Sequence, residues 1–213
     1  MVPRARNSKV KVLITGHTSG IGKFLLEHYT NNGHTVIGMS RSNGYDILKD
    51  QDKIIDEAKD VDLFINNATS GTGQLDLLKK LCFKIPNIVT MSTMGTEFTN
   101  VWANQYHYDK IDLENAFKLM TMNPNVGNLL LLKISFAETT YSDFKEDRIN
   151  SDSVIPYQQL ANSIDFWLDN PKVTQINYAV KLTEYTIDQA KKLTNNPELV
   201  DNIVKQTKEV CKL

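Results

Sequence analysis

The chain has 213 residues, 41% of them hydrophobic, and its 24 basic and 25 acidic residues give a net charge of -1. This length suits one compact domain. The balanced charge argues against a nucleic acid or an anionic membrane as partner, and no apolar stretch approaches the roughly 20 residues that span a bilayer. Cys82 and Cys211 have no spacing typical of zinc ligands. We therefore expect free thiols, no metal and a cytoplasmic protein.

The N-terminal part alternates short apolar runs with helical patterns. Residues 1–9 are basic and polar without a signal-like apolar core, and we predict a flexible arm there. The first helix has an apolar stripe made by Ile21, Phe24, Leu25 and Tyr29 and stops at residues 31–33. We predict strands at 10–14, 34–39, 44–47, 62–65 and 88–92, and further helices at 50–59 and 75–81.

The C-terminal part continues the alternation. We predict a helix at 106–120, a very apolar strand at 129–134, a polar loop or lid at 141–153, a helix at 156–169, a strand at 173–180 and two amphipathic helices within 186–213. Strand–helix–strand units predict an α/β protein with a doubly wound parallel sheet between two helical layers. We expect one domain over residues 10–180 and a helical extension, 181–213, packed on it.

A glycine-rich turn follows the first strand. The sequence Thr15-Gly16-His17-Thr18-Ser19-Gly20-Ile21-Gly22 lies between a predicted strand and a predicted helix. Glycines in such a turn allow a tight reversal, close backbone approach to a pyrophosphate and close packing of helix on strand. The anion then lies at a helix N-terminus, where free N–H groups favour negative charge. The segment therefore predicts a dinucleotide site, with an ordinary glycine-rich turn as the alternative.

This turn resembles the TGxxxGIG cofactor loop of the short-chain dehydrogenase/reductase family, whose fold is of the Rossmann type. The resemblance implies that Gly16, Gly20 and Gly22 are the loop glycines. It also implies that Ser19 and Ile21 contact phosphate and ribose, with Thr18 in the same set. Further along the chain, Asp46 resembles the family's aspartate that faces the adenine. The run Asn66-Asn67-Ala68 resembles its NNAG motif, with Thr69 in place of the glycine.

The residues after the second strand favour NADP(H) over NAD(H). An acid at this turn would bind the adenosine ribose hydroxyls, whereas an arginine pairs with a 2′-phosphate. The chain has Ser40-Arg41-Ser42 and no acid at the turn. A guanidinium beside two hydroxyl groups suits a phosphate because it can donate paired, charge-assisted hydrogen bonds. We therefore expect NADP(H) as the preferred cofactor and NAD(H) as the alternative.

The candidate catalytic residues follow the fifth predicted strand. Tyr106 and Lys110, four residues apart on a predicted helix, share one face. A nearby cation stabilises phenolate, and a free phenol has a pKa near 10. Ser92, at the end of its strand and three residues before Gly95, resembles the family's catalytic serine. The family resemblance covers about residues 10–180 and implies that Tyr106 transfers a proton, Lys110 lowers its pKa and holds the nicotinamide ribose, and Ser92 binds the substrate oxygen.

The sequence also departs from the family. The segment between the second and fourth predicted strands is short, and the family's catalytic asparagine has no clear counterpart. The usual Pro-Gly after residue 135 is absent, and Thr139 or Thr140 takes the place of the threonine near the pyrophosphate. The chain therefore resembles a compact, divergent member. Its substrate, a small carbonyl or alcohol, is not identified by the sequence.

The sequence is consistent with three functions. The first is an NADP(H)-dependent oxidoreductase that transfers a hydride between nicotinamide and a carbonyl or hydroxyl group. The second is a catalytically silent NADP(H)-binding regulator or scaffold, which would not need Ser92, Tyr106 and Lys110 together. The third, a nucleotide-sugar enzyme, is disfavoured by the short region after residue 135. Phe166 and Trp167 on the helix before the last strand suit a subunit interface, and we expect a homodimer or homotetramer.

Overall fold

A computed structural model describes residues 9–98, 104–137, 154–179, 184–194 and 196–210. Its centre is a six-stranded sheet in the order β2-β1-β3-β4-β5-β6, in which every neighbouring pair is parallel. The strands are β1 (Lys11–Thr15), β2 (Thr35–Met39), β3 (Leu63–Asn66), β4 (Asn87–Thr93), β5 (Asn128–Ile134) and β6 (Gln175–Tyr178). The expected doubly wound α/β fold is confirmed.

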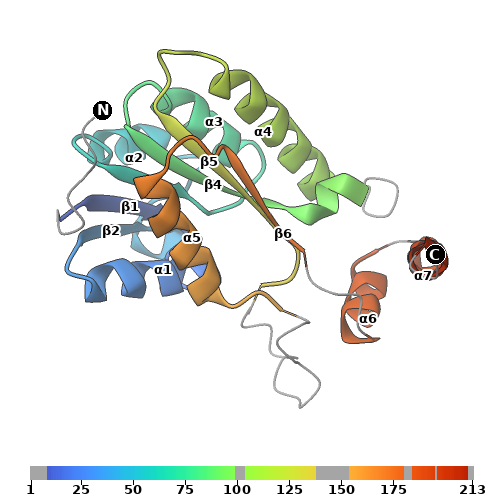
Figure 1. Ribbon diagram of the computed structural model, residues 1–213. Coiled ribbons are helices and arrows are strands. Elements are labelled where there is room, and N and C mark those ends of the chain that lie inside the picture. Colours follow the sequence, from blue (N-terminus) through green and yellow to red (C-terminus); the bar gives the residue numbers. More distant parts are fainter. Residues whose placement is uncertain (1–8, 99–103, 138–153, 180–183, 195, 211–213) are drawn as a thin grey trace.

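Helices cover both faces of the sheet (Figure 1). The α-helices are α1 (Gly20–Asn31), α2 (Gln51–Glu57), α3 (Gly73–Leu81), α4 (Gln105–Thr121), α5 (Tyr157–Asp169), α6 (Glu184–Leu193) and α7 (Pro197–Val210). Two short 3-10 helices, η1 (Arg41–Asn43) and η2 (Met94–Phe98), follow β2 and β4. Helices α1 and α5 pack on one face of the sheet, and α2, α3 and α4 on the other.

Two hydrophobic cores hold these layers together. Alternation along β1 places Val12 and Ile14 in the core under α1 and α5, and Leu13 in the core under the other helices. The first core contains the fully buried Trp167, and the second contains Phe64. Burying a large apolar side chain contributes roughly 1.5–3 kcal/mol relative to leaving it exposed. The central strands are therefore fixed from both sides, which fixes the positions of the residues at their ends.

One strand prediction was wrong. The segment 44–47 forms no strand and instead lies in a turn between η1 and α2. Gly44 has a φ of 86°, a left-handed conformation that interrupts extended backbone. The Asp46 carboxylate then accepts a hydrogen bond from the Leu48 N–H at 2.8 Å, closing a local turn. Asp46 therefore lies in a loop and not at the end of a strand.

Of the two aromatic residues of α5 that we expected at a subunit interface, Trp167 was predicted wrongly. Trp167 is fully buried and its indole N–H donates to the Val173 carbonyl at 2.8 Å, so it belongs to the core and is not available to a subunit interface. Phe166, one residue earlier, is 62% exposed. Adjacent helical positions point about 100° apart, which is why only one of the pair can face the sheet.

The C-terminal helices α6 and α7 contact each other beyond β6, at the end of the sheet opposite β2 (Figure 1). Pro197 begins α7, the helical position at which proline is best tolerated. The lid predicted at 141–153, together with Thr139 and Thr140, lies outside the described residues. Among the helices that the structure describes, none is long and apolar enough to cross a membrane.

Candidate functional site

The predicted site residues gather at the carboxyl edge of the sheet. The glycine loop follows β1, Asn66 ends β3 and Ser92 lies next to the end of β4. Because β1, β3 and β4 are parallel neighbours, their carboxyl ends meet at one edge. In open α/β sheets this edge is where ligands bind.

The backbone of the glycine loop packs so tightly that three of its positions require glycine. Gly16 and Gly20 have φ values of 72° and 53°, a region that side chains with a Cβ rarely adopt. A Cβ added at Gly22 would lie 2.1 Å from the Gly16 carbonyl oxygen, so the loop could not close on itself with any other residue there. Helix α1 begins at Gly20, and the Ser19 side chain makes no capping hydrogen bond. The loop therefore directs the first turn of α1 toward an anion position.

The loop is tied to β3 by Asn67 and Thr15. The buried Thr15 hydroxyl accepts from the backbone N–H groups of Asn67 at 3.0 Å and Ala68 at 3.1 Å. The Asn67 amide donates in return to the carbonyls of Thr15 at 3.1 Å and Gly16 at 3.3 Å. The two side-chain hydrogen bonds explain why asparagine suits this position, because one short side chain reaches two successive carbonyls.

A histidine of the loop packs over β2. A Cβ added at Gly38 would lie 2.5 Å from the His17 ring and 2.7 Å from the Leu26 side chain. The ring therefore lies directly on the backbone of β2, and its Nδ1 is buried without a hydrogen-bond partner. Gly16 N–H also donates to the Met39 carbonyl at 2.7 Å, which joins the loop to the end of β2.

The turn after β2 presents Arg41 and two serines. Arg41 is exposed and is the first residue of η1. The Ser40 and Ser42 hydroxyls lie 2.7 Å apart, and the Asn43 amide donates to the Gly38 carbonyl at 2.8 Å, which fixes the turn. One cation and two hydroxyl groups are thus grouped beyond the end of β2.

Lys110 is buried and its ammonium is fully hydrogen-bonded. Its Nζ donates to the Thr69 hydroxyl at 3.0 Å, the Gln74 side-chain oxygen at 2.6 Å and the Met91 carbonyl at 2.9 Å. The ring of Tyr106, which is 44% exposed, has its centre 5.6 Å from the same Nζ. Burial lowers the pKa of Lys110 to about 7, although the charges of Glu114 and Asp109 act to raise it. The structure thus brings the predicted Tyr–Lys pair together, with the lysine below and the tyrosine at the surface.

Gln74 is a site residue that the sequence did not predict. It is 2% exposed, and its Nε2 donates to the carbonyls of Asn66 at 2.7 Å and Met91 at 2.9 Å. Its oxygen is thereby aimed at Lys110. Asn66 completes the link by donating to the Gln74 carbonyl at 2.8 Å. A single glutamine early in a helix carries no sequence signal of this role, because its partners lie on β3, β4 and α4.

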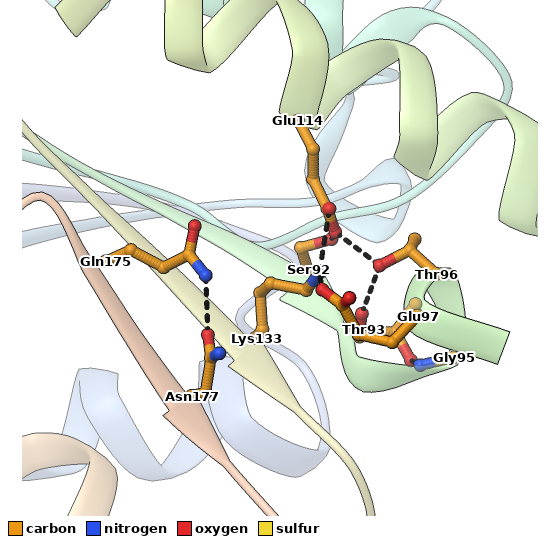
Figure 2. A network of polar contacts seen from close by, with 9 residues as sticks. All are labelled: Ser92, Thr93, Gly95, Thr96, Glu97, Glu114, Lys133, Gln175 and Asn177. Atoms are coloured by element: carbon orange, nitrogen blue, oxygen red, sulfur yellow. Dashed lines mark hydrogen bonds and ion pairs between the residues drawn. The ribbon is translucent and has the colours of Figure 1, made fainter.

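Ser92 belongs to a second buried network, shown in Figure 2. The Ser92 hydroxyl donates to Glu114 at 2.6 Å, and the Thr96 hydroxyl lies 2.9 Å from the same carboxylate oxygen. The other oxygen of Glu114 accepts from Lys133 at 2.9 Å, and Lys133 also contacts Glu97. The carboxylate is therefore both hydrogen-bonded and paired with a cation, as a buried charge requires.

Glu114 and Lys133 were also missed, although the sequence holds a signal for each. Glu114 follows Lys110 by four residues and therefore lies on the same face of α4. Lys133 interrupts the apolar run of β5, where a charged residue needs a buried partner. The register pairs Ser92 with Lys133 across β4 and β5, which brings the two signals together.

Tyr108 and His107, the aromatic residues next to Tyr106 in the sequence, do not contact Lys110 in any hydrogen bond described above. Tyr108 is 49% exposed. The His107 ring packs where a Cβ at Gly95 would lie 2.5 Å away, and its Nδ1 lies 2.8 Å from the Asn104 side chain. Partial burial lowers the pKa of His107.

In the part of the chain that the structure describes, no cluster of three His, Cys, Asp or Glu side chains could hold a metal ion.

No family model matches this sequence, and no curated protein does. Solved structures match its fold. A short-chain dehydrogenase from Burkholderia cenocepacia J2315 in complex with NADP has a TM-score of 0.66 at 14% identity, over 91% of this chain and 96% of that one. A short-chain dehydrogenase from Streptomyces avermitilis has 0.62 at 17% identity, over 96% and 98%. A 3-ketoacyl-(acyl-carrier-protein) reductase from Brucella melitensis complexed with NADH has 0.61 at 16%, over 79% and 96%. The chain thus has the fold of these two short-chain dehydrogenases and of this reductase.

Proposed function

We propose that this chain is an NADP(H)-dependent short-chain oxidoreductase that acts on a small carbonyl or alcohol. The observation that carries the proposal is the placement of Tyr106 and the buried Lys110 on α4, with the Lys110 ammonium bonded to the carbonyl of Met91, the residue before Ser92, at the sheet edge that also carries the glycine loop. The structures of this fold described above include two complexes with nicotinamide cofactors, one with NADP and one with NADH, which supports a nicotinamide cofactor here.

The glycine loop fits a dinucleotide. The left-handed glycines, the close contact at Gly22 and the first turn of α1 without a side-chain cap provide backbone N–H groups and no obstructing Cβ. Thr18, Ser19, Gly20 and Ile21 would contact the phosphates and ribose. The segment 66–68 supports the loop, through Asn67 in particular, and Asp46 lies in the turn beyond β2.

Tyr106 is the proton donor or acceptor in this proposal. A phenol with a pKa near 10 needs a nearby positive charge to act at neutral pH. The Lys110 ammonium supplies that charge 5.6 Å from the centre of the ring. When bound, the nicotinamide supplies or accepts the hydride. The chain positions the substrate oxygen and moves its proton.

Ser92 would hold the substrate oxygen through the network of Glu114. Its single hydroxyl proton is directed to the carboxylate at 2.6 Å, so its oxygen lone pairs are free to accept a hydrogen bond. A substrate alcohol can donate to such an oxygen, whereas a carbonyl oxygen, which only accepts, would have to receive the Ser92 proton in place of Glu114. Lys133 pairs with Glu114 and holds it in place, so the orientation of Ser92 depends on this buried ion pair.

NADP(H) is preferred in this proposal because of the group beyond β2. Arg41 is exposed beside the Ser40 and Ser42 hydroxyls, a set that suits a 2′-phosphate, and the position has no carboxylate to bind the ribose hydroxyls. NAD(H) is the alternative cofactor.

We also propose that residues 10–180 form the dinucleotide-binding and catalytic domain and that 181–213 pack on it. The protein would be a cytoplasmic homodimer or homotetramer. The exposed Phe166 supports an interface along α5.

The test is an NADPH-oxidation screen over a panel of aldehydes and ketones. We expect turnover by the unmodified protein, and a loss of about 100-fold or more in kcat for Tyr106→Phe, with the affinity for NADPH nearly unchanged. Tyr108→Phe is the matched control and should keep the rate. A Tyr106→Phe variant with full activity would contradict the proposal. Binding of NADPH without turnover of any substrate would favour the catalytically silent alternative.

The same preparation tests cofactor preference by direct titration. NADPH should bind more tightly than NADH, and Arg41→Ala should narrow the difference because the 2′-phosphate loses its cation. Equal affinities in the unmodified protein would contradict the role given to Arg41.

A further inference from the structure

The ammonium of Lys110 has no proton left for a ligand. A lysine ammonium has three N–H donors, and here each has an acceptor within 3.0 Å: Thr69, Gln74 and Met91. A ligand oxygen can therefore accept from this nitrogen only if one of the three hydrogen bonds is broken.

Two of the three acceptors are held in place. The Met91 carbonyl belongs to β4, and the residue is 4% exposed. Gln74 is 2% exposed and is fixed by its own donation to the carbonyls of Asn66 and Met91. Displacing the Gln74 oxygen would leave a buried polar group without a partner, which is costly, and the Met91 carbonyl is fixed in the backbone of β4.

Thr69 is the exchangeable acceptor. It is exposed, so its hydroxyl can turn to water when it leaves Lys110. It lies in the segment after β3, directly beyond Asn67 and Ala68, which hold the glycine loop. Thr69 thus stands between the loop and α4, at the side from which a bound dinucleotide would approach the ammonium.

We propose that the Thr69 hydroxyl competes with a ribose hydroxyl of the bound cofactor for one proton of Lys110, and so weakens cofactor binding. This inference rests on the proposed function, because it assumes a nicotinamide nucleotide at Lys110. Thr69 is a positioning residue that acts through the lysine. It occupies the place where the NNAG motif has a glycine, which could not compete.

The experiment measures dissociation constants by titration for the unmodified protein, Thr69→Ala and Thr69→Ser. The probes are NADPH and 2′,5′-ADP, which is the adenosine half of the cofactor without the nicotinamide ribose. We expect Thr69→Ala to bind NADPH about 3- to 10-fold more tightly, the size of one net hydrogen bond. Thr69→Ser, which keeps the hydroxyl, should match the unmodified protein. The affinity for 2′,5′-ADP should not change in any of the three.

The 2′,5′-ADP arm separates competition at Lys110 from a general change in the loop. If Thr69→Ala tightens both probes equally, or leaves NADPH unchanged, the inference is overturned. Thr69→Val, of similar volume but without the hydroxyl, gives a second variant in case the alanine protein does not fold. In a Lys110→Met background, Thr69→Ala should have no effect on the affinity for NADPH.

The outcomes also distinguish this inference from the proposed function. If the unmodified protein binds NADPH and Thr69→Ala binds it no better, only the competition is refuted. If neither protein binds NADPH or 2′,5′-ADP, the proposed function fails and the competition fails with it.

Discussion

Two lysines near the carboxyl edge of the sheet, Lys110 and Lys133, are each 3% exposed but have opposite surroundings. Lys110 is bound by a hydroxyl, an amide oxygen and a carbonyl, all neutral. Lys133 is bound by two carboxylates, Glu114 and Glu97. Burial without a contacting carboxylate lowers the pKa of a lysine, whereas carboxylates that bind an ammonium offset the cost of burying its charge. The surroundings of Lys110 suit a group that takes part in a reaction, and those of Lys133 suit an ion pair that stabilises the fold.

The largest effect should come from breaking the supporting pair. In Lys133→Met, the Glu114 carboxylate stays buried without its cation, and we expect a loss of about 3–5 kcal/mol in the free energy of unfolding, measured with urea. Lys118→Met, on the exposed side of the same α4 helix, is the control and should change stability by less than about 0.5 kcal/mol. A loss for Lys133→Met as small as that of the control would show that the pair does not support the fold.

A medium effect should appear in the pH dependence of stability that Lys110 causes. Its pKa is about 7 in the folded chain against an ordinary value of 10.5. Below pH 7 both states carry the proton, so the cost of burying the charge is fully present. Between these values the unfolded chain binds more protons than the folded one, and stability therefore rises with pH.

We expect the free energy of unfolding of the unmodified protein, relative to that of Lys110→Met, to rise by roughly 2 kcal/mol from about pH 7.5 to about pH 9. The measurement is urea unfolding at several pH values. Lys133→Met should keep this slope, because Lys110 is intact in it. A flat difference would mean that Lys110 keeps its charge despite its neutral surroundings.

The smallest effect should come from Glu97. Its side chain is 50% exposed, and the hydrogen bond from Lys133 holds its pKa below the ordinary value. Solvent screens this pair, so Glu97→Gln should cost about 1 kcal/mol or less at neutral pH. The contribution is present above the ordinary carboxyl pKa and is lost as the pH falls through the lowered one. A cost as large as that of Lys133→Met would mean that Glu97, not Glu114, is the main partner.

The networks around Lys110 and Lys133 also show which parts of the site could be predicted from the sequence. Residues that act through local spacing were placed correctly: the glycine loop between β1 and α1, and Tyr106 with Lys110 one turn apart on α4. Local turn chemistry was misread at 44–47, where a left-handed glycine and a side-chain hydrogen bond overrule a short apolar pattern. At α5, the helical pattern did not reveal which of Phe166 and Trp167 faces the core.

Residues whose partners come from distant segments could not be predicted. Gln74 contacts residues 8, 17 and 36 positions away, and Glu114 and Lys133 are 19 positions apart. Such contacts depend on the order of strands and on which face of each helix meets the sheet. Both are settled only when the whole chain folds.

The contact of His17 with Gly38 has a consequence for comparing related sequences. The histidine ring occupies the space that any Cβ at position 38 would need. A large side chain at position 17 therefore requires a glycine at position 38. We expect homologues with a side chain at position 38 to have smaller side chains at positions 17 and 26, so that these three positions covary.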